Sequence, residues 1–152
     1  MTRRRNQKGN TFVEFALAVT ILVPIFTGAF QYGYTFYVYN ELVNAVRDGA
    51  RNASYRKLSN AGDGTTPTAF STAVKNVVVY GNNAGTGNPV VPNLTTTNVS
   101  VAATFDADNV PTDVTVGITG YTVNGLFGSV TFNKPTLKMP YLGTYCATGT
   151  SC

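Results

Sequence analysis

The chain has 152 residues, of which only 12% are charged and none is His or Trp, whereas an ordinary soluble domain has about 25% charged residues. The absence of His removes the commonest general base, metal ligand and near-neutral proton switch. The sequence also lacks paired-carboxylate and nucleophile motifs and has only two Cys. We therefore expect no enzyme, no cofactor and no metal site.

The net charge of +4 is unevenly distributed along the chain. Arg3, Arg4, Arg5 and Lys8 lie in the first nine residues, which contain no acid. The other seven of the 11 basic residues balance the seven acidic ones, so the chain from residue 10 to residue 152 is formally neutral. A neutral body lacks the basic surface that nucleic-acid binding requires, and we expect no nucleic acid among the partners.

An apolar segment directly follows the basic residues. Glu14 is the only charged residue between Asn10 and Phe30, and about 20 apolar residues suffice to cross a bilayer as a helix. The segment therefore predicts a membrane-spanning helix over about residues 10–30, in contact with membrane lipid. The basic residues before it predict a cytoplasmic N-terminus and an outward-facing body. The alternative, a buried helix of a soluble core, is disfavoured because the segment is apolar on all sides.

Three kinds of export signal fit a basic leader before an apolar segment. Residues 27–29, Thr-Gly-Ala, offer the small residues of a signal-peptidase site, although this interpretation leaves Glu14 unexplained. Residues 2–4 match a twin-arginine signal poorly, because Asn6 and Gln7 stand where apolar residues usually follow. An uncleaved signal anchor is the third alternative.

Glu14 separates these alternatives. A carboxylate in a membrane span costs on the order of 2.5–3.5 kcal/mol near the centre and less near the interface, and it usually has a functional partner. Glu14 is the fifth residue after Gly9. In prepilin-type signals a membrane peptidase cuts after a Gly that follows a short basic leader, and the fifth residue of the mature helix is Glu. The alternative is that Glu14 reaches into the headgroup layer and has no function.

Residues 8–17, K-G-N-T-F-V-E-F-A-L, resemble the leader and first turns of type IV prepilins and pseudopilins. The longer segment over about residues 8–55 is similar to the TadE-like family of the tight adherence (Flp) pilus system. The shared features are V-E-F-A-L, Pro24 within the apolar segment, an aromatic-rich membrane exit and A-V-R-D-G-A-R at residues 45–51.

The resemblance implies a minor pilin or pseudopilin of the bacterial inner membrane that reaches the pilus or cell surface after assembly. A prepilin peptidase would cut between Gly9 and Asn10 on the cytoplasmic side. The further implied partners are other pilin or pseudopilin subunits and the inner-membrane assembly platform. The alternative function is an uncleaved single-span anchor that displays a small β-rich binding domain.

The resemblance also gives Glu14 a role in subunit assembly. After cleavage its carboxylate would neutralise the N-terminal amine of a neighbouring subunit, since two buried opposite charges offset each other's desolvation. Pairing with the amine of the same chain is the alternative.

We predict one long helix over residues 10–57, about 70 Å in length at 1.5 Å per residue. Its first half crosses the membrane, and its second half is a stalk for the outward domain. Pro24 removes one helical hydrogen bond, which predicts a kink or local unwinding over residues 20–24, with Thr20 partly satisfying the freed groups.

Arg47, Asp48 and Arg51 lie in the second half of this helix. Arg47 and Arg51 share a face, and Asp48 can pair with Arg51 within the helix at a few tenths of a kcal/mol. The other interpretation is an electrostatic contact with another pilin or with the assembly platform. The sequence leaves both open.

After the long helix, Thr66 and Pro67 predict the N-cap and first residue of a second, short helix that ends near Gly81. The V-V-V-Y run at residues 77–80 also suits a strand. Two strands of alternating Val are expected, joined by a turn at residues 106–113, and two weaker strand candidates follow. The four strand ranges are 99–103, 114–121, 130–132 and 137–141.

The predicted fold class is α+β: a long N-terminal transmembrane and stalk helix, a short second helix and a small outward-facing antiparallel sheet. The predicted division is a cleaved leader at 1–9, the long helix at 10–57 and an extracytoplasmic β-rich domain at 58–152. Cys146 and Cys152 lie six residues apart in the C-terminal tail, and an oxidising compartment outside the cytoplasm favours a disulfide between them.

Overall fold

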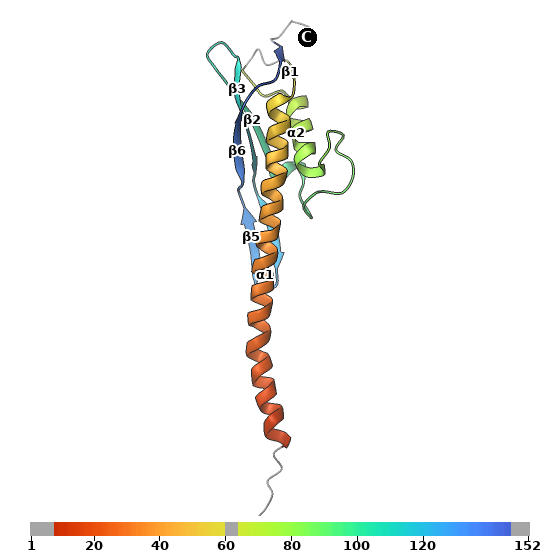
Figure 1. The fold of residues 1–152 in the computed structure, drawn as a ribbon, viewed down its shortest axis with the longest axis vertical. Helices are drawn as coiled ribbons and strands as arrows, with labels where there is room; N and C mark the ends of the chain where they lie inside the picture. The colour runs from red at the N-terminus through yellow and green to blue at the C-terminus, as the bar shows by residue number, and fades with distance from the viewer. Residues whose placement is uncertain (1–7, 60–63, 147–152) are drawn as a thin grey trace, which may run out of the picture.

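The computed structural model describes residues 8–59 and 64–146 (Figure 1). One long helix, α1, forms the axis, and the other elements pack along its C-terminal half. In the described residues the helices are α1 (Lys8–Tyr55), α2 (Thr68–Tyr80) and the 3-10 helix η1 (Thr96–Asn98). The strands are β1 (Leu58–Ser59), β2 (Val99–Phe105), β3 (Pro111–Ile118), β4 (Tyr121–Gly125), β5 (Gly128–Phe132), β6 (Thr136–Pro140) and β7 (Tyr145–Cys146).

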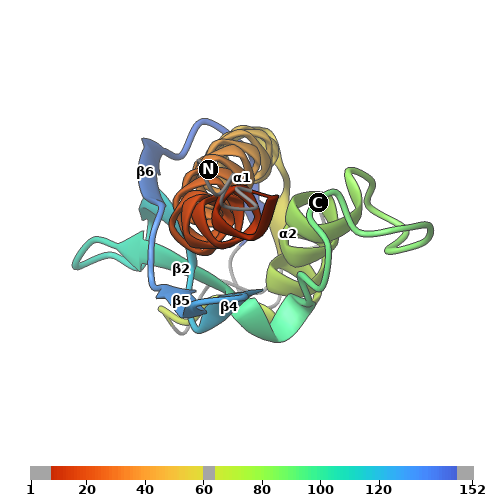
Figure 2. The ribbon, with the colours of Figure 1, turned by 90° about the horizontal axis from the view of Figure 1, so that it is seen from below.

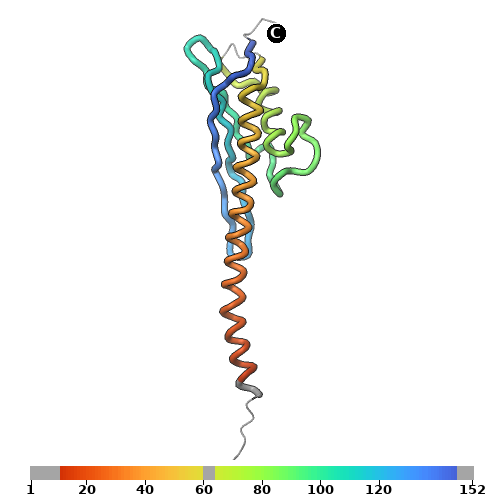
Figure 3. The backbone as a smooth tube through the Cα atoms, in the orientation of Figure 1, coloured from red at the N-terminus to blue at the C-terminus, as the bar shows by residue number. Residues whose placement is uncertain are grey.

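The predicted α+β class and the long N-terminal helix are confirmed. Helix α1 contains 48 residues, which corresponds to a length of about 70 Å. It continues as an α-helix through Pro24, so the local unwinding predicted as one alternative over residues 20–24 is not present, and the other alternative, a kink at Pro24, stays a prediction. The rest of the helix stays hydrogen-bonded on either side of the one bond that Pro24 removes, and Figure 3 shows α1 as a continuous rod.

The hydrophobic core begins in the second half of α1. The side chains of Val38, Leu42, Val46, Ala50 and Ala53 recur at helical spacing and are buried. They belong to one core cluster with buried residues of α2 and of the strands, and the end-on view in Figure 2 shows α2 and the strands on different sides of α1. The stalk is therefore part of the domain core.

The main sheet is antiparallel, with strand order β2, β3, β6. Its central strand contributes Val114, Val116 and Ile118 to the core, and all three side chains are fully buried. In the register, Val101 of β2 and Leu137 of β6 flank Val116. The alternating Val residues therefore formed strands as predicted, and the predicted turn is shorter than expected because Pro111 already begins β3.

A separate hairpin, β4 and β5, continues along α1 toward its N-terminus (Figures 1 and 3). The strand predicted over residues 114–121 includes Tyr121, which is wrong. Strand β3 ends at Ile118, and Gly120 has a φ of 64°, a left-handed conformation that ends one strand before the next begins. Tyr121 is the first residue of β4, and its register partner is Phe132.

Two details at α2 also differ from the prediction. Pro67 occupies the N-cap position and not the first helical position, and the hydroxyl of Thr66 instead accepts a hydrogen bond of 2.8 Å from the N–H of Ala103. The helix continues through residues 77–80, so this run is not a strand. It ends at Gly81, whose φ is 70° and whose N–H donates to the carbonyl of Val77.

The two ends of the C-terminal domain meet in a short parallel pair of strands. Leu58 of β1, just after α1, is opposite Tyr145 of β7. The N–H of Leu58 donates to the carbonyl of Thr144 at 3.0 Å. This pair fixes the C-terminal strand to the distal end of α1.

Candidate functional site

The first half of α1 carries apolar side chains that nothing covers. Every described side chain from residue 11 to residue 26 is exposed, including Phe12 (79%) and Phe26 (66%). Within the described residues, α1 is the one helix long and apolar enough to cross a membrane, and its most apolar window has a mean hydropathy of 2.0 with none of it buried. A core helix of a soluble protein would be mostly buried.

The predicted processing and assembly residues lie at the start of this helix. The backbone of Gly9 and Asn10 is in the first turn of α1, which begins at Lys8. Glu14 lies one turn further on, its side chain is exposed, and it is the only charged residue from there to Asn40. The structure thus places one carboxylate, that of Glu14, close to the N-terminal end of the exposed apolar half of α1.

Pro24 lies in the middle of the exposed half of α1. The hydroxyls of Thr20 and Thr27 donate to the carbonyls of Ala16 and Val23, each at 2.8 Å and each four residues earlier. These bonds satisfy the two hydroxyls within the helix, which removes the cost of exposing them to lipid.

Arg47, Asp48 and Arg51 are exposed on one side of α1. The intrahelical pair that the spacing allowed is not formed: among the described residues, the ion pair present joins Lys138 to Asp113, on β6 and β3. The three charges belong to a longer exposed stripe that also contains Asn40, Asn44 and Tyr55. This stripe lies opposite the buried face of the helix.

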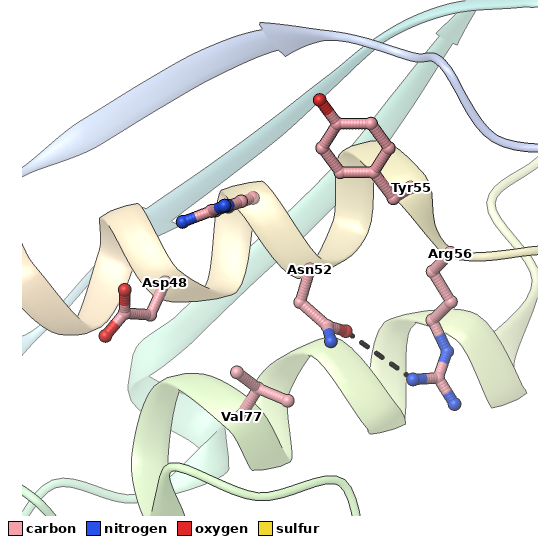
Figure 4. Close-up of a pocket in the computed structure, with 6 residues that line it drawn as sticks. Asp48, Asn52, Tyr55, Arg56 and Val77 are labelled. Atoms are coloured by element: carbon pink, nitrogen blue, oxygen red, sulfur yellow. Dashed lines mark hydrogen bonds between the residues drawn. The ribbon is translucent and has the colours of Figure 1, made fainter.

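An open depression of about 500 Å³ lies beside this stripe, between α1 and α2 (Figure 4). Asp48, Asn52, Arg56 and Val77 are among its lining residues. In Figure 4 Asn52 and Arg56 point toward α2, whereas Tyr55 points to the other side of α1. The Arg56 guanidinium donates to the side-chain carbonyls of Asn52 at 3.5 Å and Asn83 at 2.9 Å. Arg56 therefore holds the loop after α2 and is not available as a free cation.

The sequence analysis missed Gly49, which lies between the charges of the A-V-R-D-G-A-R element. Gly49 is buried, and a Cβ atom there would overlap the Cγ2 of Val78 on α2. The absence of a side chain allows the two helices to approach closely. The small residues Ala45, Ala50 and Ala53 are also buried on this part of the helix, so a run of small residues at helical spacing was the available signal.

Gln31 was also missed. Its side-chain amide donates to the carbonyl of Gly128 at 3.3 Å and accepts from the N–H of Phe127 at 3.0 Å. One side chain therefore joins α1 to the turn of the β4–β5 hairpin. Gln31 is 96 positions from Phe127 and 97 positions from Gly128 in the sequence, so no local sequence pattern could predict these contacts.

Cys146 lies in β7 and is disulfide-bonded. Its predicted partner, Cys152, lies outside the described residues, so the pairing stays a prediction. Among the described residues, no group of three or more His, Cys, Asp or Glu is arranged to hold a metal ion. The carboxylate of Asp106 accepts from the N–H groups of Asp108 and Val110 and so forms the turn between β2 and β3.

Comparison with known proteins identifies the N-terminal part of the chain. Residues 9–51 match the family model described as TadE-like protein. No curated protein and no solved structure matches the chain. The match covers the exposed apolar half of α1, Glu14, Pro24 and the A-V-R-D-G-A-R element, and it ends four residues before α1 does. The segment that forms most of the long helix is therefore similar to TadE-like proteins, as the sequence motifs indicated.

Proposed function

We propose that this chain is a minor pilin or pseudopilin-like subunit of a tight adherence pilus or a related secretion filament. The observation that carries the proposal is the two-part helix: an exposed apolar half that continues, without a break, into the core of a folded domain. A TadE-like sequence match over this same helix supports a pilus-associated membrane protein. A subunit of this shape is held in the bilayer before assembly and packs its apolar half among other subunits afterwards.

The proposal includes processing by a prepilin peptidase between Gly9 and Asn10. Cleavage would remove Arg3, Arg4, Arg5 and Lys8 together and leave a new α-amine at Asn10. The N-terminus is cytoplasmic and the domain is extracytoplasmic in this proposal, in agreement with the basic leader. The chain is then a substrate of the peptidase and performs no catalysis itself.

The role proposed for Glu14 is to neutralise the α-amine of a neighbouring subunit. In an apolar filament core either charge alone would carry a large desolvation cost, and the pair offsets it. Glu14→Gln keeps the shape of the side chain and removes its charge. We expect normal cleavage but reduced incorporation, measured as the ratio of this subunit in sheared filaments to that in membranes.

Glu41→Gln is the matched control for this experiment, because Glu41 is the next acidic residue of α1 and lies beyond the apolar half. This variant should enter filaments as the unaltered chain does. Normal incorporation of Glu14→Gln would refute the charge pairing.

The second contact proposed is the exposed charged stripe at Arg47, Asp48 and Arg51, facing another pilin or the assembly platform. Because none of the three is part of an ion pair in the described structure, Arg47→Glu with Arg51→Glu should change the free energy of unfolding by less than about 0.5 kcal/mol. The same double variant should enter filaments less well.

Lys134→Glu, a charge reversal of an exposed residue on the sheet side, is the control for the stripe. If the double variant and this control assemble equally well, the stripe is an ordinary solvated surface.

A further inference from the structure

The turn of the β4–β5 hairpin has an unusual composition. It is the two-residue connection Leu126–Phe127, flanked by the paired residues Gly125 and Gly128. The side chains of Leu126 and Phe127 are 79% and 59% exposed. Exposed hairpin turns usually carry Asn, Asp, Gly or Ser, so two large apolar side chains here require another explanation than turn formation.

The position of this turn along α1 is fixed by Gln31, through the hydrogen bonds to Phe127 and Gly128. The packing is tight, because a Cβ atom at Gly125 would overlap the Gln31 amide. The hairpin tip is therefore held against the helix at the level of residue 31.

That level coincides with the outer end of the membrane span. The predominantly apolar segment at residues 11–30, exposed except at the half-buried residues 27 and 28, corresponds to about 30 Å of helix, which is the thickness of the hydrocarbon layer. Gln31 is the first amide or charged side chain after Glu14. The tip thus lies where the hydrocarbon layer meets the headgroups.

The surface around the tip is continuous with the span and uncharged. No charged residue occurs between residues 15 and 40 of α1 or between residues 114 and 133 of the strands. A cavity of about 230 Å³ lies between the helix and the hairpin, and its lining combines Phe30, Tyr34, Val123 and Leu126 with the uncharged polar residues Thr27, Gln31 and Asn124. Aromatic side chains such as Phe30 and Tyr34 favour the membrane interface.

We infer that the hairpin tip, Leu126 and Phe127, is a second membrane contact that inserts into the outer leaflet of the bilayer beside the span. Its occupant is phospholipid at the boundary between acyl chains and headgroups, a depth that apolar interfacial groups reach. This contact sets the depth and the rotation of the domain on the membrane before assembly. The inference rests on the membrane-held state in the proposed function.

The absence of Trp from the chain allows a clean test. Phe127→Trp makes a protein with a single tryptophan, and the full-length chain is reconstituted into phospholipid vesicles with brominated acyl chains. Two further single-tryptophan proteins are the controls: Phe26→Trp in the span and Tyr55→Trp at the distal end of α1. All three positions are similarly exposed in the isolated chain.

Tryptophan at position 127 should lose emission to the brominated lipid nearly as strongly as tryptophan at position 26, and its emission should be shifted to the blue. Tryptophan at position 55 should be quenched by aqueous acrylamide only. Leu126→Trp places tryptophan at the other position of the turn and should give the same quenching as Phe127→Trp. This second variant keeps the test valid if one of the two variants fails to fold.

If positions 126 and 127 behave like position 55 while position 26 is quenched by lipid, the inference is overturned and the span stands. If tryptophan at position 26 is not quenched by brominated lipid either, the chain does not span the membrane and the membrane-held state of the proposed function is refuted. A third result would also overturn the inference: tryptophan at position 127 is protected from acrylamide to an extent that depends on the protein-to-lipid ratio, but it is not quenched by brominated lipid. This result would show that the tip contacts a second copy of the chain.

Discussion

At the scale of single residues, two tyrosines connect distant segments of the C-terminal domain. The hydroxyl of Tyr121 donates to the carbonyl of Pro92 at 2.7 Å. The hydroxyl of Tyr141 lies 2.8 Å from the carbonyl of Arg56, just after α1. Burial raises the pKa of both hydroxyls above the ordinary value of 10.0, and the nearby Tyr34 adds to the effect at Tyr121.

These pKa shifts predict a loss of stability at alkaline pH. A tyrosine whose pKa is higher in the folded state than in the unfolded state is more easily ionised on unfolding. Its stabilising contribution is therefore complete below pH 10 and is lost as the pH rises from there through the pKa of the folded state. The double variant Tyr121→Phe with Tyr141→Phe lacks both groups and both hydrogen bonds, which are worth about 1 kcal/mol each.

Denaturant unfolding in detergent at pH 8 and pH 11 measures this effect. The unaltered chain should be more stable than the double variant at pH 8, and the difference between them should shrink at pH 11. The ionisation of lysine affects both proteins and cancels in the comparison. An undiminished difference at pH 11 would show that neither tyrosine has a raised pKa.

At the scale of elements, the contact between α1 and α2 depends on Gly49. A side chain at this position would overlap Val78 of α2 and force the helices apart. Gly49→Val should therefore lower the free energy of unfolding by about 1–3 kcal/mol, the usual cost of overpacking a core. Thermal unfolding in detergent measures the effect.

Gly33→Val is the matched control, because a Cβ atom at Gly33 meets no heavy atom within 4 Å. Gly in the middle of a helix is unfavourable by roughly 0.5–1 kcal/mol relative to Ala, so this substitution should be neutral or slightly stabilising. Equal destabilisation by both variants would show that helix packing at Gly49 is not the cause.

The regular elements followed from periodicity. Leu42, Val46 and Ala50 recur at helical spacing and form part of the buried face of α1, and alternating Val predicted β2 and β3. Strand β4 was missed because Tyr121 was assigned to the preceding strand, although Tyr121 and Val123 are one position out of phase with Val114, Val116 and Ile118. The left-handed Gly120 accommodates this change of phase and separates the two strands.

The residues that join the elements were not predictable in the same way. The contact of Gln31 with Phe127 and that of Thr66 with Ala103 are made between segments far apart in the chain. Gln31 stands in no local pattern, and the local pattern around Thr66 predicted a helix cap instead of this contact. The side chains of Glu14, Arg47 and Arg51 are exposed in the structure. Their proposed roles depend on contacts with partner molecules and remain proposals.

At the scale of the whole molecule, one helix serves two environments. No core residue among those described lies before Val38, so the hydrophobic core forms against the second half of α1, and the turn of the β4–β5 hairpin reaches Gln31. The apolar side chains from residue 11 to residue 26 are exposed. Folding of this chain alone leaves that surface exposed, and lipid or neighbouring subunits are the environments that would cover it.

The mature N-terminus tests this account most directly. The chain is purified from membranes of cells with an active prepilin peptidase, and its intact mass and N-terminal peptide are determined, with peptidase-deficient cells as the control. We predict a chain that begins at Asn10 in the first case and at Met1 in the second. If only chains that retain residues 1–9 are found while the peptidase is active, the pilin proposal fails and the uncleaved membrane anchor is the function that remains.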